Sequence, residues 1–241
     1  MINNPPDFEK VSTAHKTRVL ADMADVLFDQ TWVTKQPDRA LYEMYREVHL
    51  SEKDLENMRN ASLRYDITVI PAGMLGPEFV KTAGHYHPPC SCQDCTSYPE
   101  VYQVIRGTAT YLLQKEDLTD FIVVTAIDGE VVLIPPNYGH VTVNASNSDL
   151  VMANWVSDAF QSNYEPIRER AGVAYYLTDD GFIKNKNYDQ IPNLRYGKPK
   201  SYPKVDLYSG EDMYGLINDL DKLDFLNNPG NYQDLFKKPF Y

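Results

Sequence analysis

Residues 81–87 read KTAGHYH, residues 99–104 read PEVYQV, and residues 135–144 read PPNYGHVTVN. Alternate residues of an extended strand share a face, so His85 and His87 are expected to point the same way. For the same reason, Glu100, Tyr102 and Val104 of the second stretch are expected to share a face. These three stretches therefore predict a β-structure into which polar side chains from separate strands converge.

The convergence would bring together His85, His87, Glu100 and His140, the last delivered after the Pro-Pro turn at 135–136. Three imidazoles and one carboxylate make a mixed nitrogen and oxygen site suited to Fe(II), Mn(II), Ni(II), Co(II) or Zn(II), with positions open for water or substrate. The alternative is that these histidines are unrelated. His15 and His49 lie outside the stretches and are interpreted as surface or packing residues.

After Leu63 the chain consists of short runs of Val, Ile, Thr and Tyr separated by Gly, Pro and Asn, which is typical of strands joined by turns. The spacing of the runs is that of an antiparallel barrel or sandwich, and no parallel βαβ alternation occurs. We expect strands at residues 66–70, 78–81, 86–87, 100–106, 110–114, 121–126, 131–134, 141–143, 150–156 and 173–177.

The two ends of the chain have a different pattern. Apolar residues recur at helical spacing over 17–28 and again over 38–59, so two amphipathic helices are expected there. The tail from Pro192 is rich in Tyr, Pro and Lys and then turns helical around Met213 to Leu220, wrapping the barrel or meeting another subunit. We therefore divide a single-domain protein into an N-terminal helical extension (1–62), a barrel (63–185) and a C-terminal extension (186–241).

Composition limits the function. The 241 residues carry a net charge of -11, which argues against nucleic-acid binding, because phosphate backbones require a basic face. A small anionic substrate in a pocket is compatible with that charge. No apolar run is long enough to span a bilayer, and the start resembles neither a secretory signal nor a transit peptide, so a cytoplasmic location is expected.

Cys90, Cys92 and Cys95 lie within six residues, between the second histidine of the first stretch and Glu100. Their spacing suits a zinc site that takes a fourth ligand from elsewhere, and thiols so close can also form a disulfide. The third alternative is a loop with free thiols.

The motifs resemble the paired motifs of the cupin superfamily, with twelve residues between His87 and Glu100 and Asn137 in place of a customary glycine. Over about residues 60–180 the chain is similar to the archaeal, cupin-type glucose-6-phosphate isomerases, above all in Lys-Thr-x-Gly-His-x-His and Pro-Glu-Val-Tyr-x-Val. The resemblance implies a mainly β fold, the cupin double-stranded β-helix or jelly-roll-like barrel, with helical extensions at both ends.

The same resemblance implies the roles of the site residues. One divalent ion, first of all Fe(II), with Mn(II), Ni(II) or Zn(II) as alternatives, would be held by the four residues named above. Glu100 would act as the base of an enediol route, or only as a ligand if a hydride shifts directly. The substrate phosphate would contact Thr68, Thr82, Gly84 and Tyr102, and Lys81 would add charge beside it or remain an exposed lysine without a partner.

One departure concerns Trp155-Val156, where family members carry Tyr followed by Pro, and Gln161 and Tyr164 align only loosely with their polar residues. The far wall of the sugar pocket is therefore expected to differ. Two other functions remain open: a metal-dependent cupin enzyme such as an iron dioxygenase, and a non-catalytic phosphosugar-binding cupin. For the assembly we expect a homodimer, because barrels commonly cover exposed strand edges in this way.

Overall fold

The computed structural model describes residues 8, 10–90 and 96–240, and most of its regular structure is β. The strands are β1 Ala14–Val19, β2 Ala40–Arg46, β3 Leu63–Ile70, β4 Met74–Leu75, β5 Glu78–Phe79, β6 Glu100–Arg106, β7 Thr108–Lys115, β8 Phe121–Ile127, β9 Val131–Ile134, β10 Tyr138–Val143, β11 Leu150–Ser157, β12 Tyr175–Thr178, β13 Gly181–Lys184 and β14 Leu194–Gly197. The α-helices are α2 Leu20–Met23, α3 Gln30–Val33, α4 Glu52–Asn60, α5 Glu165–Arg168 and α6 Gln233–Phe236. Five 3-10 helices complete the described elements: η1 Ala24–Val26, η2 Pro203–Val205, η3 Met213–Asn218, η4 Leu220–Leu226 and η5 Pro229–Tyr232.

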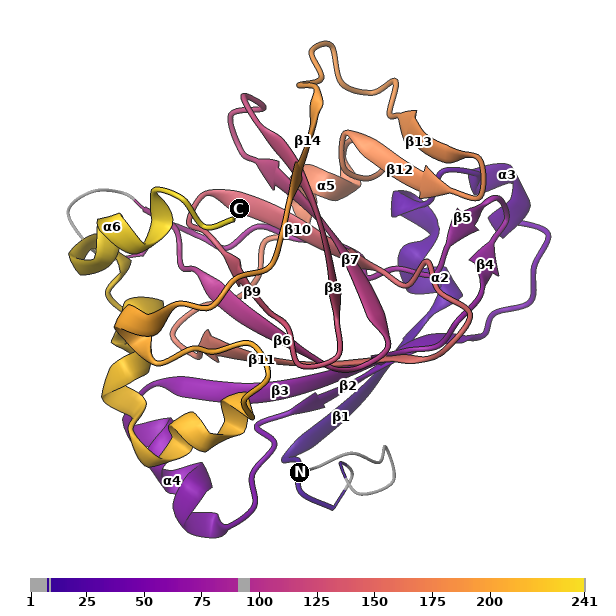
Figure 1. Ribbon diagram of the computed structural model, residues 1–241. Helices are drawn as coiled ribbons and strands as arrows, with labels where there is room; N and C mark the ends of the chain where they lie inside the picture. The colour runs from indigo at the N-terminus through magenta and orange to yellow at the C-terminus, as the bar shows by residue number, and fades with distance from the viewer. Residues whose placement is uncertain (1–7, 9, 91–95, 241) are drawn as a thin grey trace.

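Two larger sheets enclose the main core. One has six strands in the order β1-β2-β3-β11-β6-β9, and the other has four in the order β10-β7-β8-β14 (Figure 1). A smaller sheet, β13-β12-β5-β4, stands beside them. Val104 and Met152 of the first sheet belong to the same buried cluster as Leu112 and Val123 of the second. This arrangement confirms the expected mainly β, jelly-roll-like architecture with short helices near both ends.

The N-terminal segment differs from the helices expected over 17–28 and 38–59. Residues 14–19 and 40–46 are the antiparallel strands β1 and β2, and β2 pairs with β3. Helical structure occurs only at 20–26 within the first range and from Glu52 in the second. The reason lies in β2, whose buried Tyr42, Met44 and Tyr45 fit either period over so short a run. The six-stranded sheet therefore begins before the expected barrel boundary, while the three-part division itself stays a prediction.

The expected strands from 66–70 to 173–177 are largely confirmed, although residues 85 and 86 form isolated bridges instead of a strand. One pairing departs from the antiparallel expectation, because β14 runs parallel to β8. Within the described ranges, no helix is long and apolar enough to cross a membrane.

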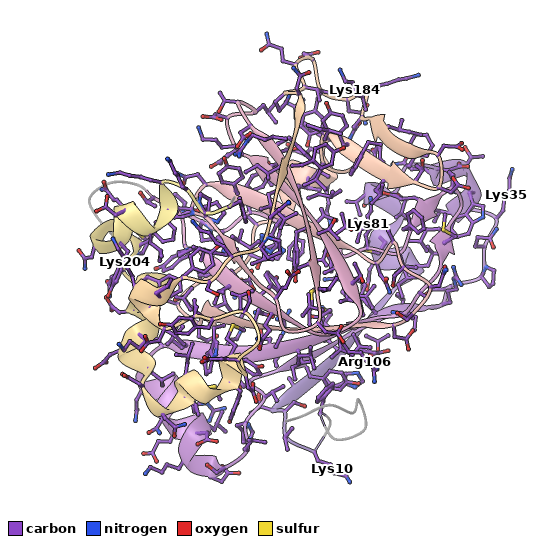
Figure 2. All side chains as sticks on the ribbon, viewed as in Figure 1. Lys10, Lys35, Lys81, Arg106, Lys184 and Lys204 are labelled. Atoms are coloured by element: carbon purple, nitrogen blue, oxygen red, sulfur yellow. The ribbon has the colours of Figure 1, made fainter. Side chains whose placement is uncertain are left out.

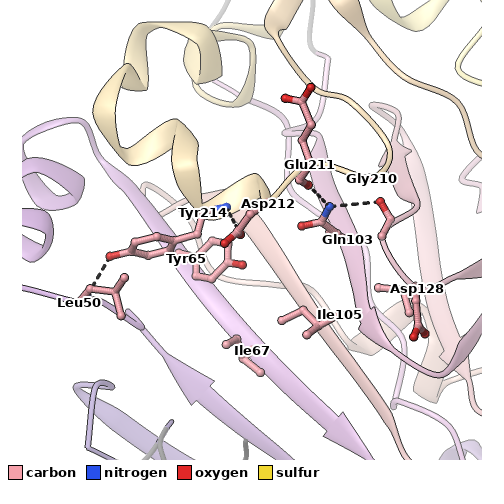
Figure 3. A pocket seen from close by; sticks show the side chains of 12 residues that line it. Leu50, Tyr65, Ile67, Gln103, Ile105, Asp128, Gly210, Glu211, Asp212 and Tyr214 are labelled. Atoms are coloured by element: carbon pink, nitrogen blue, oxygen red, sulfur yellow. Dashed lines mark hydrogen bonds between the residues drawn. The ribbon is translucent and has the colours of Figure 1, made fainter. Parts of the chain in front are cut away.

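The C-terminal segment covers the outer face of the six-stranded sheet. Gln103 of β6 donates to the carbonyls of Gly129 and Glu211 (Figure 3). It also accepts a bond from the Met213 N–H. Trp155 of β11 is fully buried under the same segment and donates from Nε1 to the Met213 carbonyl at 3.0 Å. Outward side chains of β6 and β11 are thus as buried as the inward ones, so both strands are held on two faces.

We predict that Trp155→Ala lowers the free energy of unfolding by about 3–5 kcal/mol, because it opens a cavity between sheet and tail and removes the bond to Met213. Urea denaturation followed by circular dichroism measures the change. The control is Tyr196→Ala, whose side chain is 66% exposed, with an expected effect within about 0.5 kcal/mol. Equal effects of the two changes would contradict this account of the tail.

Candidate functional site

The inner face of the six-stranded sheet forms the floor of the site. Tyr102 of β6 lies opposite Asn154 of β11, which lies opposite Asp66 of β3. In the next row Glu100 lies opposite Val156, and Val156 opposite Arg64. Because side chains alternate along each strand, these rows all face the cavity between the sheets.

The histidines reach this floor from the other side. Residues 81–87 run antiparallel to β10, with backbone bonds from His85 N to His140 O (3.3 Å) and from His140 N to His85 O (3.1 Å). Gly84 has a φ of +76°, and a Cβ there would stand 2.5 Å from a methyl carbon of Val141. The two segments therefore approach this closely only with glycine at position 84, which brings His85 and His140 side by side.

Four side chains then meet, one ligand atom from each lying within 4.8 Å of the others: His85, His87, Glu100 and His140. The Nε2 atoms of His85 and His87 are 3.1 Å apart, and Glu100 Oε2 is 3.1 Å from His140 Nε2 and 3.4 Å from His87 Nε2. Ligand atoms bound at right angles about 2.1 Å from one ion would be separated by about 3.0 Å. The observed spacing therefore fits a divalent cation.

The surroundings of the cluster agree with this fit. His87 Nδ1 lies 2.9 Å from the Tyr98 carbonyl, a contact that assigns the proton to Nδ1 and leaves the Nε2 lone pair facing the cluster. Glu100 Oε2 is buried and has no partner with hydrogen-bond geometry among the described residues. A buried carboxylate oxygen in that state favours a bound cation.

Electrostatics keep His85, His140 and Glu100 in the forms that can bind a metal ion. Desolvation lowers the pKa of His85 well below its ordinary value of 6.5, and His140 and His87 lower it further. Desolvation also lowers the pKa of His140, although Glu100 opposes this. Burial alone would raise the pKa of Glu100, but the neighbouring His140 and His87 outweigh it and hold that pKa well below 4.5. At neutral pH these two imidazoles and the carboxylate are therefore deprotonated.

The four side chains open into a cavity, and four of the five residues expected at the phosphate also line it: Thr68, Thr82, Gly84 and Tyr102. The remaining lining residues are Tyr42, Met44, Arg46, Arg64, Ala83, Met152, Asn154, Val156, Ser162 and Tyr164. Tyr102 Oη is 3.2 Å from His140 Nε2, so this hydroxyl borders the metal cluster as well.

Lys81 lies elsewhere. Its side chain is buried inside the molecule, whereas Lys35 and Lys184 extend from the periphery (Figure 2). Its ammonium group forms an ion pair with Glu78 and donates to the Val26 carbonyl at 2.9 Å. Both expectations for Lys81, a phosphate contact and an exposed lysine without a partner, are therefore wrong. The period of two explains the error, because Lys81 and Thr82 must point in opposite directions.

Arg46 and Arg64 line the cavity but were not expected there. Arg64 alternates with Asp66 and Thr68 along β3, and that spacing was a usable signal. Arg46 fell within a stretch expected to be helical, so no face of a sheet was assigned to it.

The departure at residues 155–156 has a different effect from the one expected. Trp155 points to the outer face under the C-terminal segment, and of this pair only Val156 lines the cavity. Tyr164 also lines the cavity, as does Ser162, whereas Gln161 is not among its lining residues.

The cysteine cluster is described only in part. Cys90 is disulfide-bonded, which favours the second of the three alternatives, while Cys92 and Cys95 lie outside the described residues.

We predict that the free energy of unfolding of the metal-free protein decreases as the pH falls below about 6.5. The decrease is up to about 1.4 kcal/mol per pH unit for each histidine whose pKa is lowered in the folded state. The unfolded chain binds a proton to His85 and His140 in that range and the folded chain does not, so acid favours unfolding. Urea denaturation with a chelator present, between pH 5 and 7.5, measures the slope. His85→Gln is expected to remove about half of it, and a slope unchanged by this substitution would contradict the assignment.

Comparison with known proteins agrees with this geometry. A family model described as glucose-6-phosphate isomerase matches residues 17–193. A relative named glucose-6-phosphate isomerase from Pyrococcus abyssi is 30% identical over 171 residues, covering 69% of this chain and 82% of the relative. One of the same name from Sinorhizobium medicae is 27% identical over 161 residues, covering 66% and 67%.

Among solved structures, an oxalate oxidase superposes on 52% of this chain and 56% of its own, with a TM-score of 0.39 and 12% identity. The family model covers well over half of the sequence, including every cavity residue named above. The chain therefore belongs to the glucose-6-phosphate isomerase family.

Proposed function

We propose that this chain interconverts glucose 6-phosphate and fructose 6-phosphate in the cavity beside His85, His87, Glu100 and His140. The observation that carries the proposal is the convergence of these four ligand atoms within 4.8 Å, in a chain of this family. Aldose-ketose isomerisation moves a hydrogen between C1 and C2 and a proton between their oxygens. Both transfers require groups that stabilise negative charge on the oxygens of C1 and C2.

The proposed cofactor is one divalent ion, first of all Fe(II), with Mn(II), Ni(II) and Zn(II) as alternatives that the same ligand set accepts. When bound, such an ion supplies positive charge that stabilises negative charge on the sugar oxygens. The protein holds the imidazoles in a fixed orientation, as the contact between His87 Nδ1 and the Tyr98 carbonyl shows for one of them.

Glu100 is proposed as the residue that carries the proton. Its pKa lies well below its ordinary value, so the carboxylate is ionised and ready to accept the C2 proton and return it at C1. Burial raises the pKa of Tyr102 well above 10, so its hydroxyl stays protonated beside His140 and can donate to a sugar oxygen. The competing route is a direct hydride shift, in which Glu100 acts only as a ligand.

Of the four uncharged residues expected at the phosphate, Thr68, Thr82 and Gly84 are proposed as its donors, whereas Tyr102 lies beside His140 and is proposed for a sugar oxygen instead. Thr82 Oγ1 accepts a bond from the Thr142 N–H at 2.9 Å, which leaves its own hydrogen free to donate into the cavity. Within the described residues, the Gly84 N–H and the Thr68 hydroxyl make no hydrogen bond. All three groups border the same cavity as the metal cluster.

The proposal also includes a cytoplasmic homodimer. Its support is the six-stranded sheet, which ends in β1 on one side and β9 on the other, since strand edges are commonly covered by a second subunit.

Removal of the metal is expected to abolish activity, and its return to restore it. The protein is stripped with a chelator, reloaded with Fe(II), Mn(II), Ni(II) or Zn(II), and assayed for glucose 6-phosphate formed from fructose 6-phosphate. His140→Ala should lose both metal content and turnover, while His49→Ala, outside the cluster, should keep both. Folded, metal-loaded protein without turnover would leave the dioxygenase and binding-protein alternatives, which oxygen consumption and phosphosugar binding distinguish.

Glu100→Gln is expected to reduce kcat by about 10²–10⁴-fold if the side chain carries the proton. Metal content is measured on the same sample, so that loss of a ligand is separated from loss of a base. Turnover in D₂O gives a second reading, because a proton held by Glu100 exchanges with solvent and deuterium appears on carbon in the product. Full activity in Glu100→Gln without deuterium in the product would instead establish the hydride shift.

A further inference from the structure

We propose that Arg46 and Arg64 form an anion-binding pair on the cavity floor that selects the phosphate group of the substrate. The inference rests on the proposed function, and it adds charged residues to the uncharged donors described above. Every described lysine and arginine that lines the cavity belongs to this pair.

The sheet register brings both arginines to one place. Arg64 lies two residues from Asp66 and four from Thr68 on β3, so all three share the inner face. On the neighbouring strand β2, Met44 lies opposite Thr68, and Arg46 is two residues further along the same face. The pair therefore borders Thr68, one of the proposed phosphate donors.

Asp66 holds both guanidinium groups in position. This carboxylate is fully buried, and its Oδ2 accepts from Arg46 Nη1 and from Arg64 Nε, the second at 2.8 Å. Its Oδ1 accepts from the Glu47 N–H at 3.1 Å, so both of its oxygens are bonded. A fully buried carboxylate that fixes two arginines positions them, because neither can rotate away without leaving it unpaired.

The charges on the floor do not cancel. Arg46 and Arg64 contribute two positive charges, and Asp66 balances one of them. Glu100, the other carboxylate on the floor, belongs to the four-residue cluster, where a bound cation would balance its charge. Arg64 also contacts Asp158 at 3.0 Å, but that carboxylate is 51% exposed and largely screened by solvent. Arg46 Nη2 also contacts Met44 Sδ at 3.5 Å, but Arg46 Nε and Arg64 Nη2 make no hydrogen bond within the described residues. Both side chains line the cavity and remain 35% and 19% exposed, so each keeps a donor for a ligand.

A further polar group on the floor lacks a partner. Asn154 is 97% buried, lies between Asp66 and Tyr102 across the sheet, and makes no side-chain hydrogen bond within the described residues. An amide buried to this degree is ordinarily hydrogen-bonded, so an open one lining a cavity points to a ligand. Together with the arginines it offers several N–H donors to one group of oxygens.

The chemistry of these donors favours a phosphate dianion. Guanidinium groups bind phosphate oxygens through two parallel N–H bonds, and they keep their charge at every physiological pH. A neutral sugar would leave two fixed guanidinium charges facing an uncharged ligand, and its affinity would be lower. The pair thus distinguishes the phosphorylated sugar from the free sugar.

The test compares Arg46→Gln and Arg64→Gln with the unchanged metal-loaded enzyme. Each is expected to raise KM for fructose 6-phosphate about 10- to 100-fold, with kcat changed less than about threefold. The inhibition constant of inorganic phosphate should rise by a similar factor. Arg46→Lys, which keeps the charge and loses the fork, should fall between. The matched control is Arg195→Gln, which removes an arginine paired with Asp120 that does not line the cavity, and should change neither constant.

Because Arg46→Gln leaves Asp66 with fewer partners, the double variant Arg46→Gln/Asp66→Asn serves if the single one does not fold. If folded variants keep the KM and the phosphate inhibition constant of the wild-type enzyme, the proposal that Arg46 and Arg64 bind phosphate is wrong. That result is expected if the metal ion alone holds the phosphate. Failure of the isomerase proposal looks different. The wild-type protein would then show no turnover. Calorimetry would still detect binding of inorganic phosphate, and the arginine substitutions would weaken that binding.

Discussion

The alternation of side chains along β6 and β11 is the constraint on which the rest of the structure depends. Glu100 and Tyr102 point into the cavity, while Val101 and Gln103 point to the opposite face. A slip of one residue would send the carboxylate outward and an aliphatic side chain to the imidazoles. The outer face must therefore be as well defined as the inner one. The C-terminal segment defines it by covering Trp155 and bonding Gln103.

Two buried carboxylates face the same cavity and are stabilised in opposite ways. Asp66 has cations and an N–H group as partners, all supplied by β2 and β3 or the residue that follows β2. Glu100 has imidazole nitrogens of His140 and His87 at 3.1 and 3.4 Å from its Oε2, and this oxygen lacks a hydrogen bond among the described residues. Burying an ion without a counter-ion is costly. Asp66 is stabilised by the two arginines that it binds, whereas the environment of Glu100 favours a bound cation. The contrast distinguishes a carboxylate that positions arginines from one that is proposed to bind a metal ion, both within one sheet.

The sequence allowed the barrel strands and the four-residue cluster to be predicted, because runs of β-branched residues and the paired histidine spacing are local signals. It did not reveal β2, since Tyr42, Met44 and Tyr45 are compatible with both helical and extended periods. Because of that error, Arg46 was not predicted to line the cavity. Its position depends on the pairing of β2 with β3 and not on its neighbours in sequence. The prediction for Lys81 was wrong for a related reason. Its partners Glu78 and Val26 come from different segments of the chain, and a motif alone does not show to which side of the strand a side chain points.

The arrangement of the floor also explains how a small substrate would be held at both ends. One row runs from Tyr102 on β6 through Asn154 on β11 to Asp66 on β3, with Arg46 beyond it on β2. Two inter-strand spacings, about 10 Å, separate β6 from β3. This is comparable to the length of an extended six-carbon sugar phosphate. A sugar whose C1 and C2 oxygens lie beside Tyr102 and Glu100 therefore places its phosphate toward the arginines. Fixing both ends restricts the reacting carbons to one position relative to Glu100, which is the geometric requirement for proton transfer between adjacent carbons.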